Sequence, residues 1–365
     1  MKWIVLVSFL ALAMIIGVLL VFDSDPEVDD GPQKVRVAMI MTGLRNDHSW
    51  NESHYEALQK AEKDLNLEIA YYENVPADSM AQGIMEEAVK NGAGIVIANS
   101  YGFGDVELMV ARNHPEVKFF HATGLQSATN FTSFFGRVYQ LRYLSGIVAG
   151  MKTKTNEIGY VAAYNIPEVN RGINAFTLGV HKVNPKAKVY VGWTRSWTDE
   201  SLAADAARDL FQKHNLDVFT AHVDALTPFE VADERGAWII GYNRDNAKRF
   251  PKHYLTALVW NWENFYIPKI REVLQDKFEG RNYWLGLESG IMNLSDMTEF
   301  VEDTIRAVVE EEKDRLIHGK FDVFYGPIED NQGVLRIGAG ESMTDDAMLN
   351  RFDWFVKGVV DGVNP

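Results

Sequence analysis

The chain has 365 residues, 47% of them hydrophobic, and its 51 acidic and 36 basic residues give a formal net charge of −15. This composition predicts a globular protein with one large core or two smaller ones, and the acidic surface argues against sequence-independent binding of nucleic acid. The chain contains no cysteine, which excludes disulfide bonds, thiolate metal sites, thiol nucleophiles and lipid attachment through cysteine.

The N-terminal residues predict a membrane segment. Residues 3–22 form an apolar run that would span about 30 Å of hydrocarbon as a helix, and an acidic stretch follows it. The run is longer than the usual apolar region of a signal peptide, and its Ala-Leu-Ala sequence lies in the middle. We therefore expect an uncleaved anchor at residues 1–22, with a cleaved signal as the alternative, and a tether at residues 23–33. In either case the remaining chain lies outside the cytoplasm.

From residue 34 onward, short apolar runs alternate with helical patterns. Each run is closed by Gly, Asn, Ser or Asp, and the helical patterns end at Gly or near Pro. This alternation predicts βαβ units, in which a parallel sheet is buried on both faces. The expected strands of the first series are 35–42, 68–75, 93–100 and 117–124, and its expected helices are 49–66, 77–92 and 103–115.

A second α/β series follows without a linker. Two successive series predict an α/β domain over residues 34–365, with two doubly wound lobes. Open α/β sheets bind ligands beyond the carboxyl ends of their strands, so facing lobes make a cleft that a hinge can close. The expected strands of this series are 157–165, 188–196, 217–224 and 237–243, and its expected helices are 171–185 and 199–215.

Aromatic and short polar side chains coincide at the ends of the expected strands. Flat rings stack on flat rings, and Asp and Asn can read the edge of a heterocycle by hydrogen bonding. The pattern thus favours a slot for a planar ligand, with Trp50 as one wall. The alternatives are that the tryptophans pack the core or the lobe interface, and that Asp47 or Ser49 only caps a helix. The residues at these strand ends include Asn46, Asp47, Trp50, Asn99, Ser100, Tyr101, Phe103, Tyr164, Asn165, Trp193, Arg195, Trp197, His222, Asp224, Tyr242, Asn243, Asp245, Trp260, Asn261 and Trp262.

Four segments resemble those of a known family, in the right order. They are NDHSWNESHYEAL, SFFGRVYQLRYLSGIVAG, RGINAFTLGVHKVNP and KFDVFYGPIEDNQG. The chain resembles the basic membrane protein group, the PnrA-like substrate-binding components of ABC transporters, over roughly residues 34 to 360. The resemblance implies a type I periplasmic-binding-protein fold, whose two lobes are joined by several crossings. It also implies a purine base or nucleoside as ligand and a membrane permease as partner.

The resemblance also implies roles for individual residues. Asp47 and Trp50 match the family's base-reading carboxylate and its stacking aromatic, and Asn51 matches the Asn that follows. Asn243 stands where nucleoside-binding members carry the Asp that holds the ribose, and Trp260 to Trp262 stand where they place a Lys. Asn offers a diol only one oxygen acceptor, and Trp flattens the pocket, so a free base is favoured over a nucleoside. The candidate ligand-binding residues are Asp47, Trp50, Asn51, Tyr101, Trp193, Trp197, Asn243, Asp245, Trp260 and Trp262.

Patterns typical of catalysis are weak in this chain. His222 and Asp224 form an His-x-Asp pair, which alone is a poor basis for a metal site, and no Ser-His-Asp order or paired-carboxylate cluster stands out. We therefore expect a monomeric binding protein with no catalytic residue, metal or cofactor. Two alternatives stay open: a nucleoside hydrolase using Asp47 or Asp224, and a membrane-tethered ectodomain that senses its ligand without transport.

Overall fold

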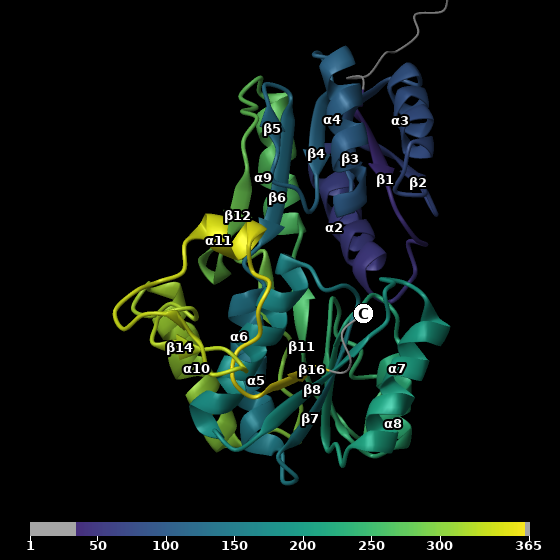
Figure 1. Ribbon diagram of the computed structural model, residues 1–365. Helices are drawn as coiled ribbons and strands as arrows, with labels where there is room; N and C mark the ends of the chain where they lie inside the picture. The colour runs from purple at the N-terminus through teal and green to yellow at the C-terminus, as the bar shows by residue number, and fades with distance from the viewer. Residues whose placement is uncertain (1–33, 362–365) are drawn as a thin grey trace, which may run out of the picture. The chain divides into compact units, whose positions relative to one another are not determined.

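Two seven-stranded sheets, each covered by helices, organise the chain in the computed structural model, which describes residues 34–361 (Figure 1). Residues 35–361 belong to one compact unit. The predicted anchor at 1–22 and tether at 23–33 lie outside the described residues, and both stay predictions. Within residues 34–361, no helix has the length and apolar character that a membrane crossing requires.

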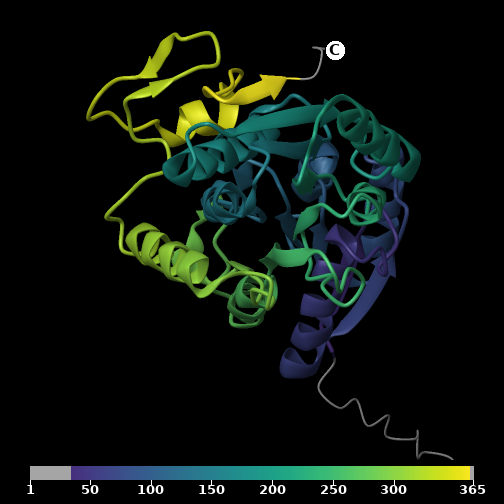
Figure 2. The same cartoon turned by 90° about the horizontal axis from the view of Figure 1, so that it is seen from below.

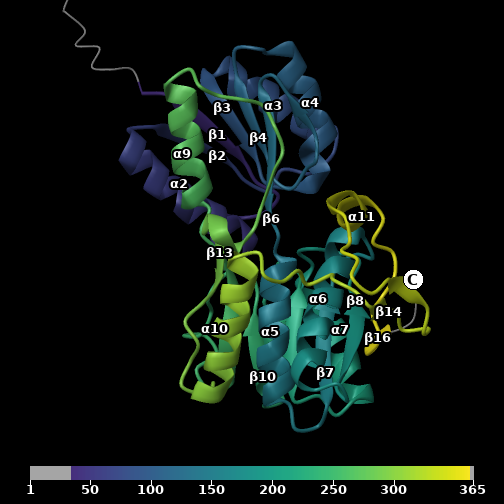
Figure 3. The same ribbon diagram turned by 90° about the vertical axis from the view of Figure 1, so that its left-hand side faces the viewer.

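The first sheet forms the core of the first lobe, with strand order β12-β6-β4-β3-β1-β2 and the short β5 paired to β6. Helices α3 and α4 cover one face, and α2 and α9 cover the other (Figure 3). The elements are β1 Arg36–Ile40, α2 Trp50–Leu65, β2 Glu68–Tyr72, α3 Met80–Lys90, β3 Ala93–Ala98, α4 Gly104–Asn113, β4 Lys118–His121, β5 Ser127–Ala128, β6 Phe131–Gly136, α9 Glu263–Leu274 and β12 Tyr283–Leu285.

The second sheet, with order β13-β11-β10-β9-β7-β8-β16, forms the second lobe. Its strands run parallel except for β13, which is antiparallel to β11. The elements are α5 Tyr139–Lys152, β7 Glu157–Ala162, α6 Pro167–Val183, β8 Lys188–Trp193, α7 Glu200–Lys213, β9 Val218–His222, α8 Thr227–Glu234, β10 Trp238–Gly241, β11 Tyr254–Trp260, β13 Met292–Leu294, α10 Asp303–Ile317 and β16 Val359–Asp361.

Two glycines allow helices α5 and α6 of the second lobe to pack closely against each other. A Cβ added at Gly146 of α5 would lie 2.0 Å from the Phe176 carbonyl oxygen, and one added at Gly179 of α6 would lie 1.9 Å from that of Tyr143. Each glycine therefore lets the facing backbone approach closely. Between α10 and β16, the chain forms the small hairpin β14 Ile328–Glu329 and β15 Leu335–Ile337 and the short helix α11 Asp345–Asn350. Figure 2 shows this C-terminal segment along the outside of the lobe, in yellow-green to yellow.

The chain crosses between the lobes three times: from β6 to α5, from β11 to α9, and from β12 to β13. The predicted α/β fold with two lobes is confirmed. The two lobes are not sequential, however, because α9 and β12 return to the first lobe after β11 is complete. Periodicity within a segment gives its secondary structure but does not report which sheet it joins.

Candidate ligand-binding site

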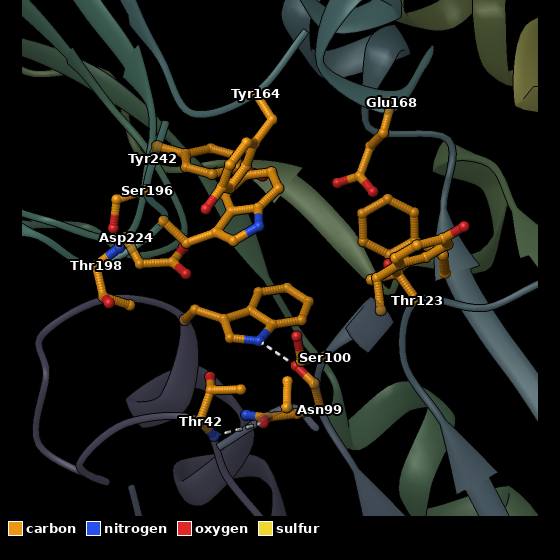
Figure 4. A pocket seen from close by; sticks show the side chains of 15 residues that line it. Thr42, Asn99, Ser100, Thr123, Tyr164, Glu168, Ser196, Thr198, Asp224 and Tyr242 are labelled. Carbon is orange, nitrogen blue, oxygen red and sulfur yellow. Dashed lines mark hydrogen bonds between the residues drawn. The ribbon is translucent and has the colours of Figure 1, made fainter. Parts of the chain in front are cut away.

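A cavity of about 220 Å³ lies where the carboxyl ends of the strands of both lobes meet (Figure 4). Many of its lining residues lie in the loops that follow the strands, as expected for open α/β sheets. The first lobe contributes Thr42, Trp50, Ala77, Asn99, Ser100, Tyr101, Thr123 and Phe135, and the second contributes Tyr164, Glu168, Ser196, Trp197, Thr198, Asp224 and Tyr242.

Trp50 lines the cavity from the first turn of α2, where it is 8% exposed. Its indole Nε1 donates a hydrogen bond of 2.6 Å to the carbonyl oxygen of Asn99. Edge-to-face contacts with Trp260 and Trp262, at centroid distances of 5.8 and 5.7 Å, support it from behind. A buried aromatic with its polar atom bonded has few ways to reorient, so this wall of the cavity is fixed.

Asp47 and Asn51 do not line the cavity but build the turn that presents Trp50. Asp47 Oδ1 accepts from the backbone N–H groups of Ser49 (2.9 Å) and Glu52 (3.0 Å), and Oδ2 accepts from the backbone (2.9 Å) and side chain (2.8 Å) of Asn51. These four bonds satisfy N–H groups at the start of α2. Asn51 in turn accepts from Asn99 Nδ2 at 2.9 Å. In this structure Asp47 is a capping residue.

Trp260 and Trp262 also lie behind the cavity wall. Their rings stack at 4.4 Å with an interplanar angle of 10°, in the crossing from β11 to α9. Trp262 is fully buried and also stacks on His54 at 4.8 Å. These two residues form the core of the hinge region, which is the packing role considered as the alternative above.

Asn243 joins the two lobes from a buried position with φ 65°. Its Nδ2 donates to Ser49 Oγ of the first lobe (3.0 Å) and to Asp224 Oδ1 of the second (2.8 Å), while its Oδ1 accepts from Trp260 Nε1 (3.0 Å). Both polar atoms of its side chain are thus hydrogen-bonded within the protein. Asp245 is exposed on the same loop, where its Oδ1 accepts from the Ala247 N–H at 3.0 Å. Neither residue lines the cavity.

The wall from the second lobe is built on the loop after β8. Trp197 lines the cavity half-buried, with its ring 5.7 Å from that of Tyr164. Its carbonyl oxygen accepts from the Asp224 N–H at 2.7 Å, which ties the loop to the end of β9. Trp193 instead lies 6.2 Å from Phe355 and outside the cavity lining. Tyr101 is a lining residue at the rim of the first lobe, 67% exposed.

Asp224 and Glu168 carry the only formal charges among the described residues that line the cavity. Figure 4 shows them on opposite sides. Desolvation raises the pKa of the Asp224 carboxyl well above its ordinary value, and the nearby Asp47 carboxylate raises it further, against the hydrogen bond from Asn243. These effects make the protonated acid, which can donate a hydrogen bond to a ligand, easier to form than at an exposed Asp.

The pKa of the Glu168 carboxyl is also raised, but several opposing effects act on it. Burial raises the pKa of its carboxyl, while Arg171, a hydrogen bond from the Thr123 side chain and Arg142 act in the opposite direction. Glu168 was not a candidate from the sequence, because it lies in the first turn of α6 rather than at a strand end. The sequence did contain a relevant pattern: Pro167 is typical of a helix start, and it puts Glu168 in the first turn of the helix that follows β7. Thr42, Thr123, Phe135, Ser196 and Thr198 were also missed.

The described residues contain no group of three His, Asp or Glu side chains that could hold a metal ion. His222 and Asp224 do not form such a site: the nearest acidic partner of His222 Nε2 is Glu168, at 3.9 Å. The cavity therefore offers aromatic faces, hydroxyl groups and two carboxyl groups, which suit binding of an uncharged planar molecule.

Comparison with known proteins agrees with this geometry. A family model described as ABC transporter substrate-binding protein PnrA-like matches residues 34–321. A purine-binding protein of Brucella abortus is 32% identical over 90% of this chain and 94% of its own length. A protein of Haloferax volcanii named as an ABC transporter glucose-binding protein is 30% identical over 92% of this chain and 84% of its own.

A solved ABC transporter solute-binding protein from Aeropyrum pernix superposes with a TM-score of 0.70 at 19% identity, covering 86% of this chain and 95% of that one. This likeness confirms the predicted type I periplasmic-binding-protein fold. Proteins of the family are substrate-binding components rather than enzymes. The chain belongs to the PnrA-like family of ABC transporter substrate-binding proteins.

Proposed function

We propose that this protein captures a purine nucleobase outside the cytoplasm and delivers it to the permease of an ABC importer. The observation that carries the proposal is the cavity itself, in which Trp50 and Trp197 come from opposite lobes and two carboxyl groups lie on opposite sides (Figure 4). Aromatic faces hold a flat ring by stacking, and carboxyl groups bond to nitrogens at its edge. The purine-binding protein of Brucella abortus adds support.

The composition of the cavity favours a neutral ligand. Its described lining contains no Lys or Arg, so a phosphorylated ligand would find no cation there. Glucose, which is part of the name of the Haloferax volcanii relative, is the main competitor, since sugars also bind to aromatic faces and carboxyl groups. A planar purine can use both tryptophans by stacking, which a puckered sugar ring does less completely.

The location and partners follow from the same proposal. An anchor at residues 1–22 and a tether at 23–33 would hold a monomeric binding domain at the outer face of the cell membrane, near its permease. A membrane-tethered sensor would bind the same ligand, so binding alone does not separate the two roles. Loss of purine uptake after deletion of the gene supports transport, and unchanged uptake with altered gene expression favours sensing.

Calorimetric titration tests the ligand class directly. Purified protein is titrated with adenine, guanine, hypoxanthine, their nucleosides and glucose. We expect at least one free base to bind more tightly than its nucleoside and more tightly than glucose. Tighter binding of glucose than of every purine would overturn the proposed ligand, and release of ribose from a nucleoside would overturn the proposal of binding without catalysis.

A further inference from the structure

Glu168 stands at the neck between the Trp-lined cavity and a second, larger one. The second cavity measures about 590 Å³ and shares Tyr101, Thr123, Phe135 and Glu168 with the first. Beyond the neck it is lined by a different set of residues, which includes Arg137, Arg171, Trp284, Asp345 and Asn350. In the part of the chain that the structure describes, Glu168 is the only charged side chain that lines both cavities.

Two buried guanidinium groups near Glu168 have no carboxylate partner among the described residues. Arg142 donates to the Ala221 carbonyl oxygen (3.1 Å) and Thr220 Oγ1 (3.4 Å), and Arg171 donates to the Met348 carbonyl oxygen (2.6 Å). Both are at most 2% exposed, and both act electrostatically on Glu168. Their charges partly offset the effect of burial, which raises the pKa of the Glu168 carboxyl.

Arg137 differs, because its charge is already matched. Its guanidinium forms a bidentate pair with Asp345, with Nη1 and Nη2 at 2.8 and 2.5 Å from the two carboxylate oxygens. It therefore contributes little free positive charge to the neck. The Glu168 side chain is 19% exposed and already accepts one hydrogen bond, from the Thr123 side chain. A carboxyl group can accept more than one, and a ligand in the cavity can supply a further donor.

We propose that Glu168 makes the site prefer free bases to nucleosides. It would do so by accepting a hydrogen bond from the N–H of ring nitrogen N9, which carries the sugar instead of a proton in nucleosides. The inference rests on the proposed function and goes beyond it, since it names the residue that separates free bases from their N9-substituted forms. Adenine offers one ring N–H, at its imidazole ring, and that proton is absent from adenosine. Binding of adenosine would deprive the Glu168 carboxyl group of this ligand hydrogen bond, and the sugar would have to pass the neck.

The second cavity gives Glu168 a steric role as well. A substituent that passes the neck enters the 590 Å³ cavity, which has room for a sugar. Truncation of Glu168 would thus remove both the hydrogen-bond acceptor and one of the four side chains that line both cavities. The same substitution should weaken binding of the base and strengthen binding of the nucleoside relative to it.

Titration calorimetry of the full-length protein with adenine, 9-methyladenine and adenosine tests this proposal. The methyl group removes the N–H while adding little bulk. We expect the wild type to bind adenine at least about tenfold more tightly than 9-methyladenine, because a site built around a donor rejects an analogue without it. In Glu168→Ala the ratio should fall to about one to three, and the ratio of adenine to adenosine affinity should fall as well.

Two further variants complete the experiment. Glu168→Gln keeps the size of the side chain and should show an intermediate ratio, and it carries the test if a thermal melt shows that Glu168→Ala is unfolded. Glu230→Gln, on the far surface at an exposed ion pair with Arg249, should keep the wild-type ratio. Wild-type affinities for adenine and 9-methyladenine within twofold, or an unchanged ratio in the Glu168 variants, would overturn the inference alone. Absence of binding by any purine would overturn the proposed function together with it.

Discussion

The two tryptophan walls of the cavity are held in different ways. Trp50 is nearly buried, bonds Asn99 through its indole N–H and rests on Trp260 and Trp262 of the hinge region. Trp197 is half-buried on a loop, and its ring neighbours within residues 34–361 are Tyr164 and His222, at 5.7 and 5.9 Å.

This difference shows how one residue type serves two tasks in one site. The first wall belongs both to the cavity and to the core that joins the lobes, so stability and binding are linked there. The second wall only borders the core, because Trp197 is a partly buried residue at its edge. Substitutions at Trp50, Trp262 and Trp197 should therefore separate into those that change both properties and those that change one.

Trp50→Ala should have the largest effect. Removal of a nearly buried tryptophan from a packed cluster costs about 3–5 kcal/mol of unfolding free energy. Loss of the stack on the ligand costs a further ~1–3 kcal/mol of binding free energy, or roughly ten- to a hundredfold in Kd. Thermal melts and calorimetry measure the two effects.

Trp50→Phe serves as its control, because a ring face remains. It should recover most of the affinity and part of the stability. An unchanged Kd in folded Trp50→Ala would contradict a stacking role and leave only a packing role for this side chain.

Trp262→Ala should lower stability without a comparable effect on binding. The ring is fully buried between His54 and Trp260, so its loss should cost about 3–5 kcal/mol in chemical denaturation. Since it does not line the cavity, the Kd of the folded protein should change by less than about threefold. A larger loss of affinity at unchanged stability would place Trp262 on the ligand instead.

Trp197→Ala should show the opposite separation. We expect an affinity loss of about 1–3 kcal/mol from the missing stack, with little change in the melting temperature because the ring is half exposed. Trp193→Ala is the matched control, since Trp193 is the last residue of β8, four residues before Trp197, and lies outside the cavity lining. Equal affinity losses in the two variants would indicate a general disturbance of the β8 end.

Acid should lower the free energy of unfolding through His54, which stacks on Trp262. Burial lowers the pKa of His54 well below its ordinary value of about 6.5, so below that pH the unfolded chain binds a proton that the folded protein excludes. Stability is thus lost as pH falls, by at most ~1.4 kcal/mol per pH unit below 6.5. Other buried groups titrate too, so the measurement compares urea unfolding of wild type and His54→Gln between pH 7 and 5.5. Parallel curves for the two proteins would refute this account.

The sequence predicted the fold well because its information is local. Apolar runs and helix stops mark each βαβ unit regardless of what surrounds it. The strand-end pattern identified four residues that line the cavity, at the carboxyl edges of the two sheets: Trp50, Tyr101, Trp197 and Asp224. Trp262 carries the same local signal as Trp50 yet lies in the core, because the segment that follows β11 crosses to the other lobe. That route depends on tertiary packing, which a strand-end pattern does not contain. Glu168 was missed for the complementary reason, since a helix start reaches the cleft only after the lobes assemble.

The smallest expected effect concerns the ion pairs that join the lobes beside Trp50. Arg244, after β10 in the second lobe, lies 2.5 Å from Glu52 and 2.8 Å from Glu56 on α2 of the first. Pairs of this exposure contribute about 0.5–1 kcal/mol each, so Arg244→Ala should weaken ligand binding by roughly two- to fivefold.

The contribution should act through closure of the lobes, and solution scattering can detect it. The wild-type radius of gyration should shrink when ligand is added, and Arg244→Ala should need more ligand to reach the same radius. Arg208→Ala is the control, because Arg208 pairs with Asp205 within one helix of the second lobe. High salt should reduce the difference between wild type and Arg244→Ala, since it screens exposed charges. If both arginine variants close at the wild-type ligand concentration, the interlobe ion pairs do not stabilise the closed state. That role would then fall to uncharged contacts between the lobes, such as the buried hydrogen bond from Asn243 to Ser49.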